Sequence, residues 1–212
     1  MANDSTTFEL SRSELHAVAG YAAACARSAL AIFERARPDD RRPRAAIDAA
    51  QAFAAGGART KALRDRAWAA HRAAQEARDA GQAAASEAAR AALGAAGAAF
   101  LHPLAKATQV KHILGSAAHA ARAFELAAGD DPAVGADHLA QARILAHAHP
   151  VVVEVLRRYP VAPRGGGRVG ALIRQLDASL RRRTKNAPSA SSLQEPLAQW
   201  RASGHWTHAG SP

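Results

Sequence analysis

The sequence predicts an all-α fold, organised as one domain of about eight helices packed as antiparallel helical hairpins. Hydrophobic residues make up 49% of the 212 residues, and much of that share is alanine, the strongest helix former. Aromatic residues contribute only 5%, and the β-branched residues that favour strands are sparse. Apolar residues also recur three and four positions apart, between segments marked by capping residues, glycine and proline. A chain of this length has room for one domain with a core made mainly of small side chains.

The first predicted helix covers residues 12–36 and opens with the capping-box pattern Ser11-Arg12-Ser13-Glu14. A corner follows at Arg37-Pro38-Asp39-Asp40-Arg41-Arg42-Pro43-Arg44. Proline at 38 disfavours helical geometry in the residue before it, and the two aspartates are favourable N-cap residues. A proline at 43 is tolerated in the first turn of a helix. The pattern therefore predicts a second helix over about 41–55, which Gly56-Gly57 ends.

The remaining helices are predicted from the same signals. We expect them over about 58–80, 82–101, from a break or kink at His102-Pro103 to about 128, 132–147, 151–159 and 169–183. Asp131 and Pro132 supply the N-cap and first position of the helix over 132–147. Residues 1–10 are expected to be a flexible N-terminus, 11–184 the helical domain and 185–212 a disordered tail. Trp200 and Trp206 in that tail either dock on the domain or form a short binding motif.

The chain is strongly basic, with a formal net charge of +10. The excess lies within residues 57–80, 151–168 and 169–186. Solvated helix faces explain such an excess most simply. A functional explanation is a basic patch that follows a phosphate backbone, with Arg64, Arg72, Arg181, Arg182 and Arg183 as candidates. The last three also complement the negative end of a helix dipole. Because the aromatic platforms and zinc ligands of many nucleic-acid readers are missing, nucleic-acid binding is the less favoured alternative.

The sequence does not favour catalysis, a metal site or a cofactor. His112 and His119 lie seven residues apart, and His147 and His149 two apart, without carboxylates or a second cysteine to complete a metal site. Cys25 lies in an apolar helical pattern without a nearby base, so we expect a buried, inert thiol. Gly165-Gly166-Gly167 lacks the lysine and hydroxyl residue of a P-loop. A single cysteine, a polar N-terminus and the lack of a long apolar run favour a cytoplasmic protein that spans no membrane.

The charged residues of the corner are the other candidate site. Arg37, Asp39, Asp40, Arg41 and Arg44 either pair locally to fix the corner or contact a partner. Local pairing, with Asp39 and Asp40 bound to Arg37, Arg41 or Arg44, is the favoured interpretation. Replacing the aspartates distinguishes the two roles, because one predicts lost stability and the other lost binding.

The stretch from Arg37 to Ile47 resembles a segment of the Imm-five-like immunity proteins. Trp68-Ala69-Ala70-His71 and the leucine-rich stretch from Gly170 to Leu180 are similar to later segments of that family. The resemblance implies a non-enzymatic, helical interaction protein that binds and neutralises a cognate toxin. It also implies a protein partner and no chemistry of the protein's own. A basic inhibitor suits an acidic toxin face, so we expect that the protein does not plug a phosphate-binding groove.

Overall fold

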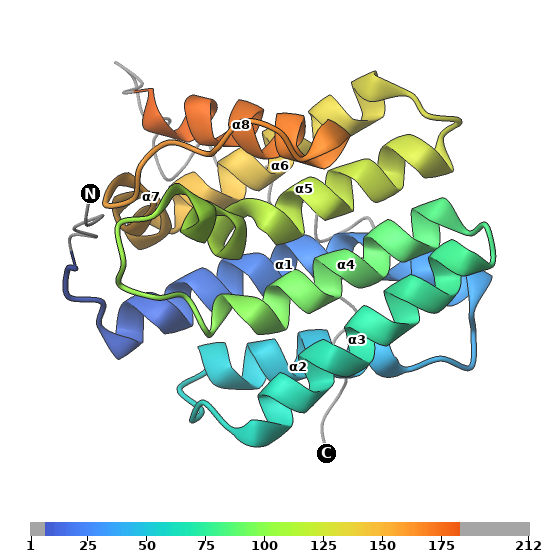
Figure 1. The fold of residues 1–212 in the computed structure, drawn as a ribbon, viewed down its shortest axis with the longest axis horizontal. Helices are drawn as coiled ribbons and strands as arrows, with labels where there is room; N and C mark the ends of the chain where they lie inside the picture. The colour runs from blue at the N-terminus through green and yellow to red at the C-terminus, as the bar shows by residue number, and fades with distance from the viewer. Residues whose placement is uncertain (1–6, 183–212) are drawn as a thin grey trace, which may run out of the picture.

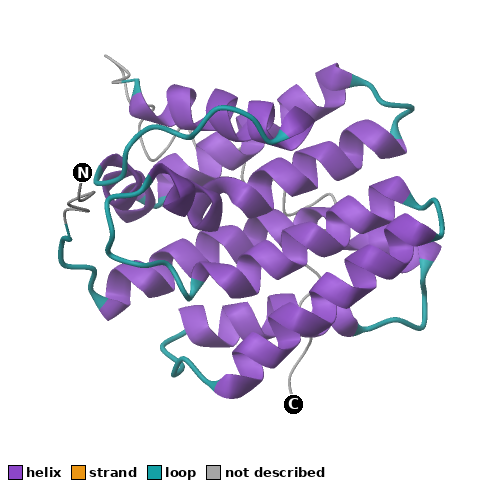
Figure 2. Cartoon of the chain, viewed as in Figure 1, coloured by secondary structure: helices purple, strands orange, loops and turns teal. Residues whose placement is uncertain are grey.

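The computed structural model describes residues 7–182, and in this range the chain consists of helices and connecting loops (Figures 1 and 2). The all-α prediction is confirmed. The elements are α1 (Arg12–Ala36), α2 (Arg42–Ala54), α3 (Lys61–Asp79), α4 (Ala83–Ala98), the 3₁₀ helix η1 (Ala107–Gln109), α5 (Val110–Ala127), α6 (Pro132–Ala148), α7 (Pro150–Arg157) and α8 (Gly167–Arg181).

Three helices, α1, α4 and α5, form the centre of the domain, and each packs against the other two. Helices α2 and α3 cover one side of this group, whereas α6 and α8 lie on the α5 side (Figure 1). Successive helices form close pairs, as α3–α4 and α4–α5 do. The main exception is α1, which packs most extensively on α4, far along the chain.

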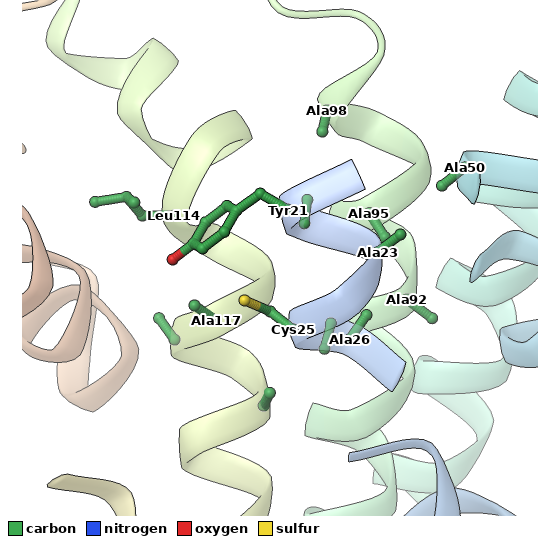
Figure 3. Close-up of a cluster of buried hydrophobic side chains, with 14 of the residues drawn as sticks. Tyr21, Ala23, Cys25, Ala26, Ala50, Ala92, Ala95, Ala98, Leu114 and Ala117 are labelled. Atoms are coloured by element: carbon green, nitrogen blue, oxygen red, sulfur yellow. The ribbon is translucent and has the colours of Figure 1, made fainter. Parts of the chain in front are cut away.

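Alanine fills most of the space between the central helices. Figure 3 shows Ala23 and Ala26 of α1 on the side of α4, where Ala92 and Ala95 lie. Ala26 and Ala92 are completely buried. Because an alanine side chain ends at Cβ, helices that meet through alanine approach closely and pack backbone against backbone.

The α5 side of α1 is different, because it carries larger side chains. Tyr21 and Cys25 point towards α5, where Leu114 and Ala117 lie (Figure 3). The Cys25 thiol is buried, as predicted, and burial raises its pKa to about 12. A thiol with such a pKa stays protonated at neutral pH and is a poor nucleophile.

Helix α1 is long and apolar enough to cross a membrane by length and composition alone. Its most apolar window has a mean hydropathy of 1.3, but 72% of that window is buried inside the fold. The apolar surface of α1 is therefore used in packing against neighbouring helices.

The predicted helix starts are confirmed at two caps. The Ser11 N–H donates to Glu14 at 2.7 Å, and the Glu14 N–H donates to the Ser11 hydroxyl at 3.2 Å, which completes the capping box. Asp131 accepts from the Ala133 N–H at 2.9 Å, with Pro132 at the first helical position. The start of α3 was misplaced, because Thr60 is its N-cap and accepts from the Leu63 N–H at 3.2 Å.

Of the two alternatives at His102-Pro103, the structure has the break and not the kink. The break is longer than predicted, because Pro103 has no N–H and the loop pairs with the N-terminal segment, so α5 begins only at Val110. The Phe8 N–H donates to the Pro103 carbonyl at 3.1 Å, and the Phe8 ring meets that of Tyr159 edge to face. Phe8 and Leu10 therefore pack against the core, whereas residues 1–6 of the predicted flexible N-terminus lie outside the described residues. The predicted tail over 185–212, Trp200 and Trp206 included, lies outside the described residues.

Candidate functional site

The corner between α1 and α2 is held by the side chain of Asp40. Its carboxylate accepts from the backbone N–H of Arg42 at 3.1 Å, and from the Arg42 guanidinium at 2.9 and 2.7 Å. The Arg42 side chain thereby lowers the pKa of the Asp40 carboxyl below its ordinary value. The N-cap position of α2 is occupied by Arg41, whose side chain makes no capping bond. Asp40, one residue earlier, accepts from the first N–H of the helix instead.

Two arginines of the corner connect it to the junction of α3 and α4. Arg42 donates to Glu76 of α3 at 2.8 Å through one guanidinium nitrogen, and the other nitrogen also contacts that carboxylate. Arg37 donates to the Glu76 backbone carbonyl at 2.9 Å and to the Gln82 side chain at 2.8 Å. A cation at this carbonyl also complements the negative C-terminal end of α3. The corner is thus fixed to elements about 40 residues further along the chain.

The other two arginines of the corner bind back to α1. Arg44 forms a two-pronged pair with Glu34, at 2.7 and 2.6 Å. Arg41 approaches the same carboxylate at 3.9 Å, but its side chain is 70% exposed. Bidentate arginine–carboxylate pairs are the geometrically specific ones, so Arg44 fixes the angle between α1 and α2.

The predicted pairing within the corner was therefore wrong in its partners. Asp40 binds Arg42, while Arg37 and Arg44 bind Glu76 and Glu34. Asp39 is exposed and has no hydrogen bond or ion pair to any other residue within 7–182. Of the two aspartates, only Asp40 has a structural role, and Asp39 is free to contact a partner.

Replacing the two aspartates separately tests this division. Asp40→Ala is expected to lower the free energy of unfolding by about 1–2 kcal/mol, because it removes a helix cap and a charge-assisted hydrogen bond. Asp39→Ala is expected to change it by less than about 0.5 kcal/mol, as exposed residues usually do. Urea unfolding followed by circular dichroism measures both. Equal losses for the two variants would contradict the assignment.

A second candidate surface lies on α3 around Trp68. The Trp68 side chain is 57% exposed and meets the ring of His71 edge to face at 5.8 Å. Arg64 and Arg72 lie one turn before and one turn after it, so the three share one helix face. We call the set Arg59, Arg64, Trp68, His71, Arg72 and Phe100 the α3 surface.

Phe100 extends this surface from α3 to the end of α4. The guanidinium groups of Arg64 and Arg59 lie 5.0 and 5.9 Å from the centre of its ring. Such cation–π contacts hold the arginine side chains without neutralising their charge. Arg59 also borders a cavity of about 210 Å³, which Leu10, Arg12, Leu15 and Phe53 line as well.

The candidate basic residues of α8 lie elsewhere. Helix α8 packs on α5, α6 and α7, on the opposite side of the domain from α3 (Figure 1). Arg181 donates to Asp177 at 2.6 Å and to the Leu156 carbonyl at 3.0 Å, so it holds α8 to α7. Arg182 is exposed, and Arg183 lies outside the described residues. Arg64 and Arg72 therefore form no continuous patch with the α8 arginines.

Residues 9–148 match the family model described as "Imm-5 like putative immunity protein". The match covers about two thirds of the chain. The chain belongs to this family. No match to a curated protein or to a solved structure was found.

The family match spans the helices from α1 to α6. The corner and Trp68-Ala69-Ala70-His71, which carried the resemblance in the sequence, both lie within it. The stretch from Gly170 to Leu180 lies outside it, so α8 adds nothing to the assignment. Both candidate surfaces thus belong to the part of the chain that defines it as a member of the immunity protein family.

A buried ion cluster holds α8 against α5. The Glu125 side chain on α5 is completely buried and accepts from Arg122 at 2.8 Å and from Arg168 of α8 at 2.5 Å. Burial raises the pKa of the Glu125 carboxyl, but the hydrogen bonds from Arg168 and Arg122 outweigh it and leave the pKa below its ordinary value. The sequence did not reveal this cluster, because its arginines are 46 residues apart along the chain.

The histidines considered as metal ligands are distributed over several elements. His119 contacts Glu87 of α4 at 2.6 Å. His112 is largely buried on α5, and burial lowers its pKa, as it does for His147 on α6. Within residues 7–182, no three histidine, cysteine or carboxylate side chains come close enough to share a metal ion.

Proposed function

We propose that this protein is a non-enzymatic immunity protein that binds a cognate toxin and blocks it. The observation that carries the proposal is the family match over residues 9–148. Immunity by binding requires a stable surface that complements the toxin, and it requires no chemistry from the inhibitor.

The geometry of the corner supports this proposal. Arg37, Arg42 and Arg44 are used in bonds that connect α1, α2, α3 and α4. Charged groups that cross-link helices keep the outer surface in one shape before the partner arrives. A preorganised surface binds more tightly because less conformational freedom is lost on association.

The proposal also assigns a location and an interaction mode. The protein would act in the cytoplasm, because a cell that makes a toxin is exposed to that toxin there before it is exported. Its basic charge favours an acidic face of the toxin and disfavours a basic nucleic-acid-binding groove. A structure of the complex with arginines of α3 inserted into a phosphate-binding groove would contradict this mode.

Co-expression tests the proposed function. A growth-arresting protein encoded beside this one in its genome is expressed in a bacterial host, with or without this chain. We expect the wild-type chain to restore growth and to co-purify with the toxin after nuclease treatment. Growth arrest that persists despite equal expression of both proteins would contradict the proposal. Binding only to nucleic acid, lost steeply as salt rises, would favour the alternative of a nucleic-acid-associated protein.

A further inference from the structure

Among the large hydrophobic side chains that are exposed within residues 7–182, Trp68 is the aromatic one. A tryptophan carries a large apolar area, whose burial would be strongly favourable. In this chain, alanines on the opposite face of α3 form the packing surface, and Ala67, Ala70 and Ala74 are buried there. Trp68 therefore adds little to the core and presents its ring to solvent.

The charges on α3 are unevenly satisfied. Each acidic residue of the helix has a basic partner: Asp65 pairs with Lys61, Glu76 with Arg42 and Asp79 with Arg78. Arg64 and Arg72, on either side of Trp68, form no ion pair with any residue between 7 and 182. The α3 surface therefore presents unneutralised positive charge around an aromatic centre.

We propose that the α3 surface docks onto an acidic face of the toxin, with Trp68 as the buried anchor and Arg64 and Arg72 as the flanking charges. This inference rests on the proposed function and assigns it a site. Tryptophan and arginine are the residues that most often dominate the free energy of protein–protein binding, when they are buried at the centre of the contact. Two uncompensated arginines around the anchor select a partner that has carboxylates around an apolar pocket.

The composition of the surface favours a protein partner over nucleic acid. A protein surface that binds a phosphate backbone usually presents a continuous row of cations. The side of α3 that carries Trp68 also carries Asp65, Gln75 and Asp79, which interrupt such a row. The arginines of α8 lie too far around the domain to extend such a row. One aromatic anchor with a mixed polar border matches the ordinary anatomy of a protein interface.

Two variants and two matched controls test the inference. Trp68→Ala is expected to raise the Kd for the purified toxin by about 30-fold or more, as loss of a central anchor does. Arg72→Glu is expected to raise it by about 10-fold at low salt, and by less at about 300 mM NaCl, because ions screen exposed charges. Val161→Ala truncates a side chain that is 65% exposed and lies in the loop between α7 and α8, outside the α3 surface. Arg66→Glu makes the same charge change at an exposed residue of α3. Because Arg66 lies two residues before Trp68, its side chain points to a different face of the helix.

Isothermal titration calorimetry with the growth-arresting protein gives the four Kd values, and circular dichroism melting shows that each variant is folded. The inference holds if Trp68→Ala and Arg72→Glu weaken binding while Val161→Ala and Arg66→Glu stay within about twofold of wild type. It is overturned if the wild-type chain binds the toxin and all four variants bind equally well. If the wild-type chain binds no toxin, the proposed function itself fails. Salt-sensitive binding of a DNA duplex, lost in Arg72→Glu, would then assign the surface to nucleic acid.

Discussion

Ala26→Leu is expected to lower the free energy of unfolding by about 3 kcal/mol, at the upper end of the usual cost of overpacking. Ala26 is completely buried on α1, on the side where Ala92 and Ala95 of α4 lie (Figure 3). Three further carbon atoms have no space there, so α1 and α4 must move apart. Because α1 packs on both α4 and α5, a shift at this contact disturbs the whole centre of the domain. Urea unfolding at 25 °C measures the change.

Ala31→Leu is the matched control for this variant. Ala31 lies on the same helix but is exposed, so the longer side chain extends into solvent. The free energy of unfolding should change by less than about 0.5 kcal/mol. If both variants lower the free energy of unfolding equally, close packing between alanines does not stabilise the centre of the domain.

The fold class was predictable because its signals are local. Alanine content and spacing predicted the helices, and Ser11, Glu14, Asp131 and Pro132 predicted where two of them begin. The position of α1 was not predictable, because alanine faces are nearly interchangeable and do not specify a partner. The extent of the loop before η1 was also not predictable, since its pairing with residues 7–8 is a contact between distant parts of the chain.

The candidate site was predictable to a similar extent. Proline and aspartate fixed the corner as a turn, and those signals are contained within eight residues. The partners of Arg37, Arg42 and Arg44 were not predictable, because arginine side chains are long and Glu76 and Gln82 approach only in the folded domain. The exposed Trp68 was visible in the sequence, but its exposure depends on which side of α3 packs.

Gly135→Ala is expected to lower the free energy of unfolding by about 3 kcal/mol, the second large effect. Gly135 is buried in α6, directly against the side chain of Glu125. A Cβ added at this position would lie 2.5 Å from Cγ and 2.6 Å from Cδ of Glu125, and closer still to one carboxylate oxygen. Glu125 has little room to move, because Arg122 and Arg168 hold its carboxylate and its side chain is completely buried. Either α6 moves away from α5 or the buried carboxylate loses its partners.

Gly115→Ala supplies the contrast, because it makes the same substitution in the interior of α5. A Cβ there meets nothing within 4 Å apart from the neighbouring backbone of α5 itself. The alanine should therefore raise the free energy of unfolding by about 0.5–1 kcal/mol, through its higher helix propensity and the reduced freedom of the unfolded chain.

A double-mutant cycle identifies Glu125 as the cause of the loss at Gly135. In a Glu125→Ala background the clashing side chain is gone, so adding Gly135→Ala should cost much less than it does in the wild-type chain. The loss caused by Gly135→Ala in the wild-type chain, minus the loss it causes in the Glu125→Ala chain, is the free energy of the close contact. The missing partner of Arg122 and Arg168 does not affect this difference, because both chains of the Glu125→Ala background lack it. If Gly135→Ala is as costly without the Glu125 side chain as with it, the loss arises from the α6 backbone and not from this contact.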